Sequence, residues 1–328
     1  MKKFWSILLA SMMILSMTAC GGSETPASSS SSEAAPASSS EAASSEAASA
    51  SSEAASSEAS AETADVPTMP DVSNVDMAAL DAQIDELAAK VTLANEGKLV
   101  MGTSADFAPY EFHILDNGVD KIVGFDVALG QAIADELGVE FEVKDISFDS
   151  ILMELNAGTI DLGIAGFSPT PERMAAVDMS CLYYTGGQSL MIRKADADKY
   201  TGLSDFGAGK SVGAQTGSIQ EGLAKEQTPE AALVSLQTVP SIIMELKSNK
   251  IDAAYIETVV AEGYVKTQDD LMILCEVPFD AEGSSVAVKK GNTEMLDFVN
   301  AVITKVVANG DMAKFVEEAN ELSTQAAG

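Results

Sequence analysis

The amino-acid sequence predicts an α/β protein of two similar lobes, joined by two crossings of the chain, with a hinged cleft between them. From residue 98 onward, short apolar segments alternate with amphipathic segments of helical periodicity. This alternation occurs twice, and a polar, turn-rich stretch at 194–204 separates the two sets. The last segments look like a return to the first set. We therefore expect the first lobe at 98–192 and 280–328, and the second lobe at 193–279.

The N-terminus has the features of a targeting segment. Lys2 and Lys3 precede an apolar stretch, Phe4 to Met17, that is short for a membrane-spanning helix. Small residues then lead to Cys20, an arrangement that resembles a bacterial lipoprotein signal. We expect residues 1–19 to be a signal peptide and an acylated Cys20 to anchor the protein to the outer face of the cell membrane. The alternative is an ordinary secretory signal with an incidental cysteine.

Low-complexity sequence follows this segment. Residues 23–64 consist mostly of Ser, Ala and Glu, and the pentamer Ser-Ser-Glu-Ala-Ala occurs four times. Such a composition buries too little apolar surface to offset the entropy of ordering. We expect residues 20–74 to form a disordered tether.

Residues 75–97 differ from the tether. Their apolar side chains recur at spacings of three and four, and Gly97 is a plausible helix stop (Met77, Leu80, Ile84, Leu87 and Val91). We expect a leading helix that packs against the folded domain. A helix that binds a partner is the alternative.

The first lobe begins with elements in β-α-β-α-β order, which predicts an open doubly wound sheet with right-handed crossovers. Asp149 is the candidate N-cap of the second helix. The expected strands are 98–103, 139–146, 160–166 and 188–193, and the expected helices are 124–138 and 150–157.

The second lobe repeats this alternation, and the chain then returns to the first. The expected strands are 211–215, 232–236, 251–256 and 271–274, with helices from 218 to about 226, at 240–247 and from 257 to about 264. The return comprises a strand at 284–289 and helices at 293–308 and about 311–320.

The loop at 164–173 has the parts of an anion-binding site. It leaves an apolar strand, and Gly166 allows a ligand to approach the backbone closely. Ser168 offers a hydroxyl, and Arg173 can hold a carboxylate through two charge-assisted hydrogen bonds. The alternative is a plain strand–loop–helix connection with a surface arginine.

The other expected strand ends supply complementary groups. Thr216-Gly217-Ser218 precedes a helix, where backbone N–H groups favour an anion, and Glu257 offers a carboxylate, although it could equally be a helix cap. Phe107 and Phe148 offer aromatic walls, whereas we assign Tyr110 and Phe112 to the core. This set of groups matches an α-amino acid, whose carboxylate and ammonium need partners once they leave water.

Composition excludes several other functions. The net charge of −31 argues against a nucleic-acid partner, and one histidine with three cysteines argues against a zinc cluster. No metal or cofactor motif is present, so we expect none. An enzyme would need a positioned acid or base in the cleft, and we expect His113 on the surface. A disulfide between Cys181 and Cys275 is allowed outside the cytosol but is left open.

Residues 98–320 resemble bacterial extracellular solute-binding proteins of family 3, the receptors of ABC importers for polar amino acids. The motifs that carry the resemblance run through nearly the whole region: Leu99 to Thr103, Phe107 to Tyr110, Gly124 to Val127, Ile160 to Gly166, Thr170 to Arg173, Val177 to Ser180 with Tyr183-Tyr184, and Ile251 to Ala253. The resemblance implies a two-lobed, type II periplasmic-binding-protein (Venus flytrap) fold. It also implies a lipid-anchored monomer that binds a free amino acid, without catalysis, and delivers it to a membrane permease.

The resemblance also implies roles for individual residues. Arg173 would pair with the ligand carboxylate, together with Ser218 and the amide of its loop. Ser168, the Gly166 carbonyl and Glu257 would take the ammonium. Phe107 and Phe148 would sandwich the ligand. The family usually has Asp where Glu257 stands and Thr where Ser218 stands.

The sequence says less about the side chain of the ligand than about its carboxylate and ammonium groups. Members that prefer cationic ligands tend to carry an acid at the position of Ser104, and that acid is absent here. No Lys or second Arg appears among the expected lining residues, which disfavours an acidic ligand. Gln215 and Ser104 could hydrogen-bond a neutral polar side chain, so we expect a neutral, polar amino acid, with cystine left open. The same fold also carries dehydratase-like enzymes and sensory receptors, which are the alternative functions.

Overall fold

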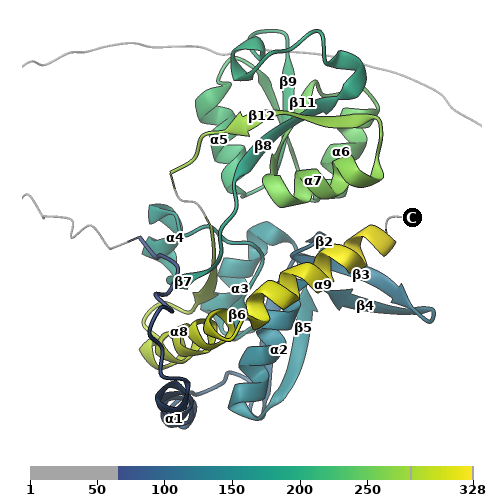
Figure 1. Cartoon of the computed structure of the whole chain (residues 1–328). Helices are drawn as coiled ribbons and strands as arrows, with labels where there is room; N and C mark the ends of the chain where they lie inside the picture. Colours follow the sequence, from purple (N-terminus) through teal and green to yellow (C-terminus); the bar gives the residue numbers. More distant parts are fainter. Residues whose placement is uncertain (1–65, 281–282, 327–328) are drawn as a thin grey trace, which may run out of the picture. The chain divides into compact units, whose positions relative to one another are not determined.

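The computed structural model describes residues 66–280 and 283–326, including two α/β lobes (Figure 1). The expected signal peptide, Cys20 and most of the expected tether lie outside these residues. Among the described residues, none of the helices combines the length and the apolar character needed to cross a membrane.

The first lobe is built on a five-stranded mixed sheet of order β5-β1-β6-β13-β7. Strand β1 pairs in parallel with β5 and β6, whereas β13 runs antiparallel to β6 and β7. Its strands are β1 (Lys98–Thr103), β5 (Glu140–Asp145), β6 (Leu162–Gly163), β7 (Asp178–Tyr184) and β13 (Ser284–Val288). Its helices are α1 (Met77–Ala88), α2 (Phe125–Leu137), α3 (Ile151–Ala157), α4 (Pro171–Ala176), α8 (Thr293–Ala308) and α9 (Asp311–Ala326).

Apolar side chains cover both faces of this sheet, as a doubly wound sheet requires. Leu129 and Ile133 of α2 lie in one cluster with Phe298 and Val302 of α8. Ile151 of α3 lies in a second cluster with the loop that follows β6. This arrangement leaves the carboxyl ends of β1 and β6 free to present loops, which is where ligands bind in α/β folds.

A small antiparallel sheet, which the sequence patterns did not reveal, follows β1. It consists of β2 (Asp106–Phe107), β3 (Glu111–Asp116) and β4 (Val119–Val123). The turn between β3 and β4 contains Asn117 and Gly118, both with positive φ, a pair typical of a two-residue hairpin.

The second lobe is a five-stranded sheet of order β10-β9-β11-β8-β12, with helices α5, α6 and α7 around it (Figure 1). Its strands are β8 (Gln188–Arg193), β9 (Ser211–Gln215), β10 (Ala232–Leu236), β11 (Ala253–Glu257) and β12 (Leu271–Val277). Its helices are α5 (Ile219–Gln227), α6 (Val239–Lys247) and α7 (Thr258–Thr267).

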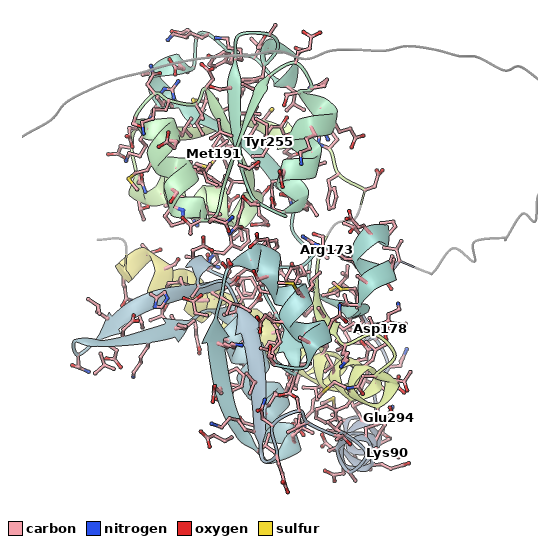
Figure 2. The ribbon with its side chains drawn as sticks, turned by 180° about the vertical axis from the view of Figure 1, so that it is seen from behind. Lys90, Arg173, Asp178, Met191, Tyr255 and Glu294 are labelled. Carbon is pink, nitrogen blue, oxygen red and sulfur yellow. The ribbon has the colours of Figure 1, made fainter. Side chains whose placement is uncertain are left out.

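The first crossing between the lobes lies earlier than the sequence predicts. Strand β8, expected in the first lobe, pairs antiparallel with β11 and β12, and both Met191 of β8 and Tyr255 of β11 belong to the second lobe (Figure 2). The crossing is therefore the segment between β7 and β8, at 185–187, and not the polar stretch at 194–204. Strand β8 is apolar on both faces, so its sequence does not indicate which sheet it joins. The second crossing lies between β12 and β13.

The expected disordered tether extends too far toward the domain, because residues before 74 already contact the first lobe. The carbonyl of Thr68 accepts a hydrogen bond from the amide of Leu182 in β7, at 3.0 Å. In α1, Leu80 and Ile84 are buried against the domain, and α1 packs on α8. Helix α1 ends at Ala88 instead of continuing to Gly97.

Two local expectations in the first lobe also differ. Asp149 does not cap α3, because Phe148–Ser150 forms a 3-10 turn that leads directly into the helix. Strand β6 is only two residues long, and it ends at Gly163, directly before the loop at 164–173. The structure has Cys181 and Cys275 as free thiols in the sheets of different lobes.

Candidate functional site

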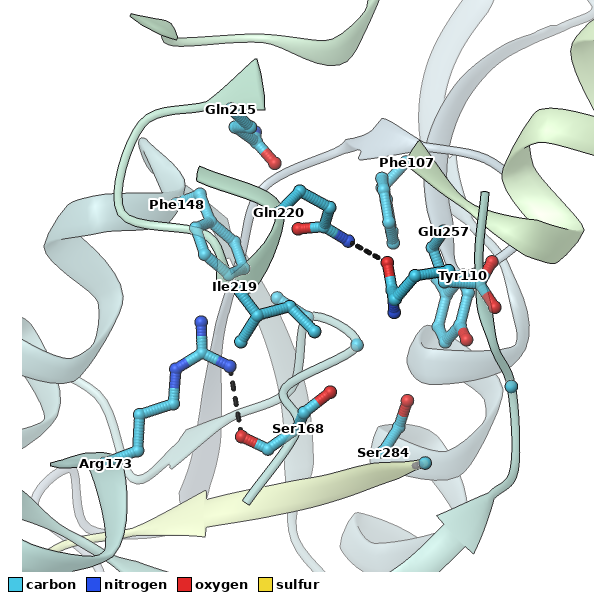
Figure 3. Close-up of a pocket in the computed structure, with 15 residues that line it drawn as sticks. Phe107, Tyr110, Phe148, Ser168, Arg173, Gln215, Ile219, Gln220, Glu257 and Ser284 are labelled. Atoms are coloured by element: carbon cyan, nitrogen blue, oxygen red, sulfur yellow. Dashed lines mark hydrogen bonds between the residues drawn. The ribbon is translucent and has the colours of Figure 1, made fainter. Parts of the chain in front are cut away.

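A pocket lies between the two lobes, at the carboxyl ends of β1, β6 and β9 (Figure 3). Seven of the nine expected site residues line it: Phe107, Phe148, Gly166, Ser168, Arg173, Gln215 and Glu257. Eight further residues complete the wall: Tyr110, Ala165, Gly186, Gln188, Ile219, Gln220, Gly283 and Ser284.

The loop after β6 is shaped so that Arg173 enters this pocket. Gly166 has φ +56°, and its amide donates to Oδ2 of the buried Asp126 at 2.9 Å. Thr170 caps α4 by accepting from the Arg173 amide at 3.3 Å, and Pro171 occupies the first turn, where no amide hydrogen is needed. Arg173 is thereby fixed in the first turn of α4.

Arg173 is buried, with only 8% of its surface exposed. Its guanidinium donates to two backbone carbonyls, those of Ser168 (3.1 Å) and, across the cleft, Gly217 (3.4 Å). It also lies over the rings of Phe148 and Phe167. Among the described residues, no carboxylate forms a salt bridge with it, and burial lowers the pKa of Arg173 to about 10. A cation buried in this way is stabilised by an anionic ligand.

Glu257 serves as both a helix cap and a pocket residue. It ends β11, and its Oε2 accepts from the amide of Val260 at 3.1 Å, which caps α7. Its Oε1 is buried without a hydrogen-bond partner. Burial raises the pKa of Glu257 to about 7. The free oxygen makes this carboxyl a ready partner for a cation.

Tyr110 is both a core residue and a pocket residue, whereas the sequence suggested core alone. Its ring packs on Phe125 (4.3 Å between centroids) and Phe107 (5.2 Å), while its side chain also lines the pocket near Glu257. Burial raises the pKa of Tyr110 well above its usual value, so the hydroxyl stays protonated. It is therefore available as a hydrogen-bond donor beside the carboxyl.

Three glutamine side chains from the second lobe face the first. Gln220 donates to the side-chain oxygen of Gln188 at 2.8 Å (Figure 3). Gln215 donates from Nε2 to the Gln237 carbonyl at 3.0 Å. Sequence reasoning found only Gln215. Amides carry no charge and follow no periodicity, so the one available signal was the position of Gln220 just inside α5.

Ser218 and Ser104 are the two expected residues that do not line the pocket. The hydroxyl of Ser218 caps α5 by accepting from the Glu221 amide at 3.2 Å, and it donates to the Gln215 carbonyl at 2.7 Å. The hydroxyl of Ser104 donates to Asp106 at 3.1 Å. Both hydroxyls are used in local structure at helix and strand ends, where serine is favoured.

A buried polar cluster supports the floor of the pocket. Asp126, below Gly166, is fully buried and lies beside Glu111 and Tyr183. Burial raises the pKa of Asp126 to about 6, and burial together with the neighbouring Asp126 raises the pKa of Glu111 well above its usual range. Two such carboxyls are most stable when at least one is protonated.

The pocket therefore offers a cation at one point, a carboxyl at another, and amides and aromatic rings around them. His113 lies outside it, half exposed, between Asp120 (3.0 Å) and Asp145 (3.2 Å). These groups are suited to holding a small zwitterion, and the histidine takes no part in the site.

Comparison with known proteins agrees with this geometry. Residues 99–319 match the family model of bacterial extracellular solute-binding proteins, family 3. The arginine-binding extracellular protein ArtP of Bacillus subtilis (strain 168) is 39% identical over 221 residues, covering 66% of this chain and 84% of the relative.

Two solved structures are similar as well. The protein AbpA of Streptococcus pneumoniae, solved with L-arginine, is 39% identical with a TM-score of 0.68, covering 70% of this chain and 97% of that one. An ancestral arginine-binding protein, solved with glutamine, is 36% identical with a TM-score of 0.63, covering 68% and 98%. The chain therefore belongs to the bacterial extracellular solute-binding proteins of family 3.

Proposed function

We propose that this protein is the substrate-binding lipoprotein of an ABC importer and that it captures a free L-amino acid with a neutral, polar side chain. The acylated Cys20 would hold it on the outer face of the cell membrane, and the permease subunits of the importer would receive its ligand. It would act as a monomer and would bind its ligand without converting it.

The observation that carries this proposal is the pair of unmatched charges in one pocket. Arg173 is a buried cation without a carboxylate partner among the described residues, and Glu257 is a buried carboxyl with a free oxygen. An α-amino acid carries the complementary carboxylate and ammonium groups. Its binding would therefore satisfy both groups at once, through charge-assisted hydrogen bonds.

Lobe closure supplies the mechanism. The pocket takes walls from both lobes, and Arg173 already reaches the Gly217 carbonyl of the second. A ligand that bridges the lobes favours the closed form, because contacts to the second wall exist only there. The permease would then distinguish the closed, loaded protein from the open one.

The proposed side-chain class follows from the remaining lining residues. Besides Arg173 and Glu257, the pocket wall holds no other charged side chain among the described residues, and its polar groups are amides and hydroxyls. The ancestral relative solved with glutamine supports a neutral carboxamide ligand. Arginine is the second candidate, favoured by the relatives that bind it, although its guanidinium would bring a second cation to a pocket with one carboxyl.

Thermal-shift measurements against all amino acids, followed by calorimetry, test the proposal. A ligand that binds only the native state must raise the melting temperature. We expect glutamine or asparagine to give the largest shift, with the ligand recovered chemically unchanged. The largest shift from arginine would overturn the neutral side-chain class in favour of the second candidate. No shift from any amino acid, or recovery of a product, would contradict the proposal. The anchor is tested separately by fatty-acid labelling in cells. The wild-type protein should take up the label, and the Cys20→Ala variant should not.

A further inference from the structure

Asp106 lies directly behind Gln215 and joins the two lobes. It belongs to β2 of the first lobe, and its Oδ2 accepts from the amide of Val239, the first residue of α6 in the second lobe, at 2.9 Å. The same oxygen accepts from Nε2 of Gln215 at 3.4 Å, and Oδ1 accepts from Ser104 at 3.1 Å. Asp106 is thus a hydrogen-bond acceptor behind the pocket residue Gln215 and does not itself line the pocket.

These contacts fix the direction of the Gln215 amide. Its Nε2 lies between Oδ2 of Asp106 and the carbonyl oxygen of Gln237, and the carbonyl can only accept. Turning the amide over would place Oε1 against both oxygens. Both N–H groups of Gln215 are therefore used, and Oε1 is the atom left for the pocket. Figure 3 shows this oxygen directed toward the interior of the pocket.

The other amide pair imposes no such direction. Gln220 donates to Gln188, but turning both amides over would give an equally good hydrogen bond between them. That pair can therefore adapt to a donor or an acceptor. Gln215, with Asp106 and Gln237 behind it, cannot. In Figure 3 it also lies on the side of the pocket away from Ser168 and Ser284.

We infer that Asp106 and the Gln237 carbonyl, by orienting Gln215, set the side-chain specificity of the pocket: the ligand must bring a hydrogen-bond donor to the Gln215 oxygen. The inference rests on the proposed function and narrows it. A carboxamide or a guanidinium satisfies Oε1. The carboxylate of glutamate or aspartate meets an acceptor instead, with the Asp106 carboxyl behind it, and leaves its own charge unpaired.

Glutamine and glutamate form the natural probe pair, because they have nearly the same shape and differ in this donor. We expect the wild-type protein to bind glutamine or arginine at least about 100-fold more tightly than glutamate, as is typical when a buried polar group is left unmatched. In Gln215→Leu, affinity for the preferred donor ligand should fall about 10-fold or more, so that its ratio to glutamate collapses.

Two variants of the positioning residue separate its role from general stability. Asp106→Ala removes one of the two oxygens that orient the Gln215 amide and leaves the Gln237 carbonyl, so we expect the ratio of the preferred ligand to glutamate to fall, but less than in Gln215→Leu. Asp106→Asn keeps an oxygen that can accept from Val239 and Gln215, so it should retain the wild-type ratio. Asp135→Ala, on the exposed face of α2, is the control and should change neither affinity nor ratio.

The outcomes are distinct from those of the proposed function. If no amino acid binds, the proposed function fails. If amino acids bind but glutamate binds within tenfold of both glutamine and arginine, this inference fails alone. It also fails if the ratio is unchanged in Gln215→Leu, a variant that leaves Asp106 and its bond to α6 in place.

Discussion

A Cβ atom placed on Gly186 would collide with Oε1 of Glu257, so the first crossing between the lobes passes directly against the free oxygen of the pocket carboxyl. The same Cβ would lie 3.4 Å from the hydroxyl of Tyr110. A side chain at this point would therefore fit only if the end of the Glu257 side chain moved. Glycine at position 186 allows the Glu257 carboxyl to keep its position, and a larger residue would displace it.

Gly186→Ala should therefore weaken ligand binding. The added methyl group must displace Glu257, and we expect a loss in affinity of about tenfold or more, equivalent to roughly 1.4 kcal/mol, by calorimetry. Gly222→Ala on α5 is a matched control, because nothing lies within 4 Å of the added atom there. Wild-type affinity in Gly186→Ala would show that the Glu257 position is not important for binding.

Affinity should depend on pH through Glu257. Burial raises its pKa to about 7 in the ligand-free protein, and the ligand ammonium requires the carboxylate form. Below about pH 7 binding must release a proton, so affinity should fall toward tenfold per pH unit. Calorimetry in buffers of different ionisation enthalpy measures this proton release. Glu257→Gln should bind weakly at every pH and release none.

The stability of the ligand-free protein should decrease as pH rises from about 5 to 7.5. Asp126, Glu257 and Glu111 all have pKa values raised by burial, so the folded state holds protons that the unfolded state releases. The stability associated with the protonated groups is complete below about pH 4.5 and is lost as pH passes through their folded values. Denaturant unfolding at pH 5 and pH 7.5 measures it. Greater stability at pH 7.5 would contradict the burial of these groups as acids.

Arg173→Met should separate binding from folding. The variant should lose ligand binding, yet its ligand-free form should be as stable as the wild type or more so, because a buried cation without a carboxylate is replaced by an apolar chain. Arg193 offers the contrast, since it is partly buried and pairs with Asp196 at 2.6 Å. Arg193→Met should destabilise the fold, because it removes one of the two cations that pair with Asp196 and leaves the carbonyls of Leu246 and Ile251 without their donor. Equal destabilisation in both would argue against an unmatched charge at Arg173.

Ser218→Ala should affect stability more than binding. Its hydroxyl caps α5, and loss of such a cap costs about 1 kcal/mol of unfolding free energy. Ligand affinity should change less than about threefold, since the hydroxyl is directed to its own backbone. A loss of binding comparable to that of Arg173→Met would indicate that Ser218 contacts the ligand carboxylate, as the resemblance implied.

Much of the site could be predicted because its chemistry is charged and local. Arg173 follows a glycine and two prolines at a strand end, and Glu257 ends a strand that a helix follows, so both patterns are visible in the sequence. Phe107 and Phe148 likewise follow predicted strands. These positions depend on where strands end, which periodicity indicates well.

The rest depends on relations that no local pattern encodes. Strand β8 is apolar on both faces, and only its partners β11 and β12 place it in the second lobe. Gln188 entered the pocket because of that placement, so the misassigned crossing also hid a site residue. Tyr110 is a second example, since its side chain both fills the core and lines the pocket, and the sequence indicated only the first role.

The central claim is that Arg173 and Glu257 together hold the two charged ends of an amino acid. Calorimetry of the preferred amino acid against its α-carboxamide and its N-acetyl derivative tests this most directly, because each derivative removes one charge and keeps the side chain. We predict that each derivative binds at least about 100-fold more weakly, about 2.7 kcal/mol or more. Binding of either derivative within tenfold of the parent amino acid would contradict the account.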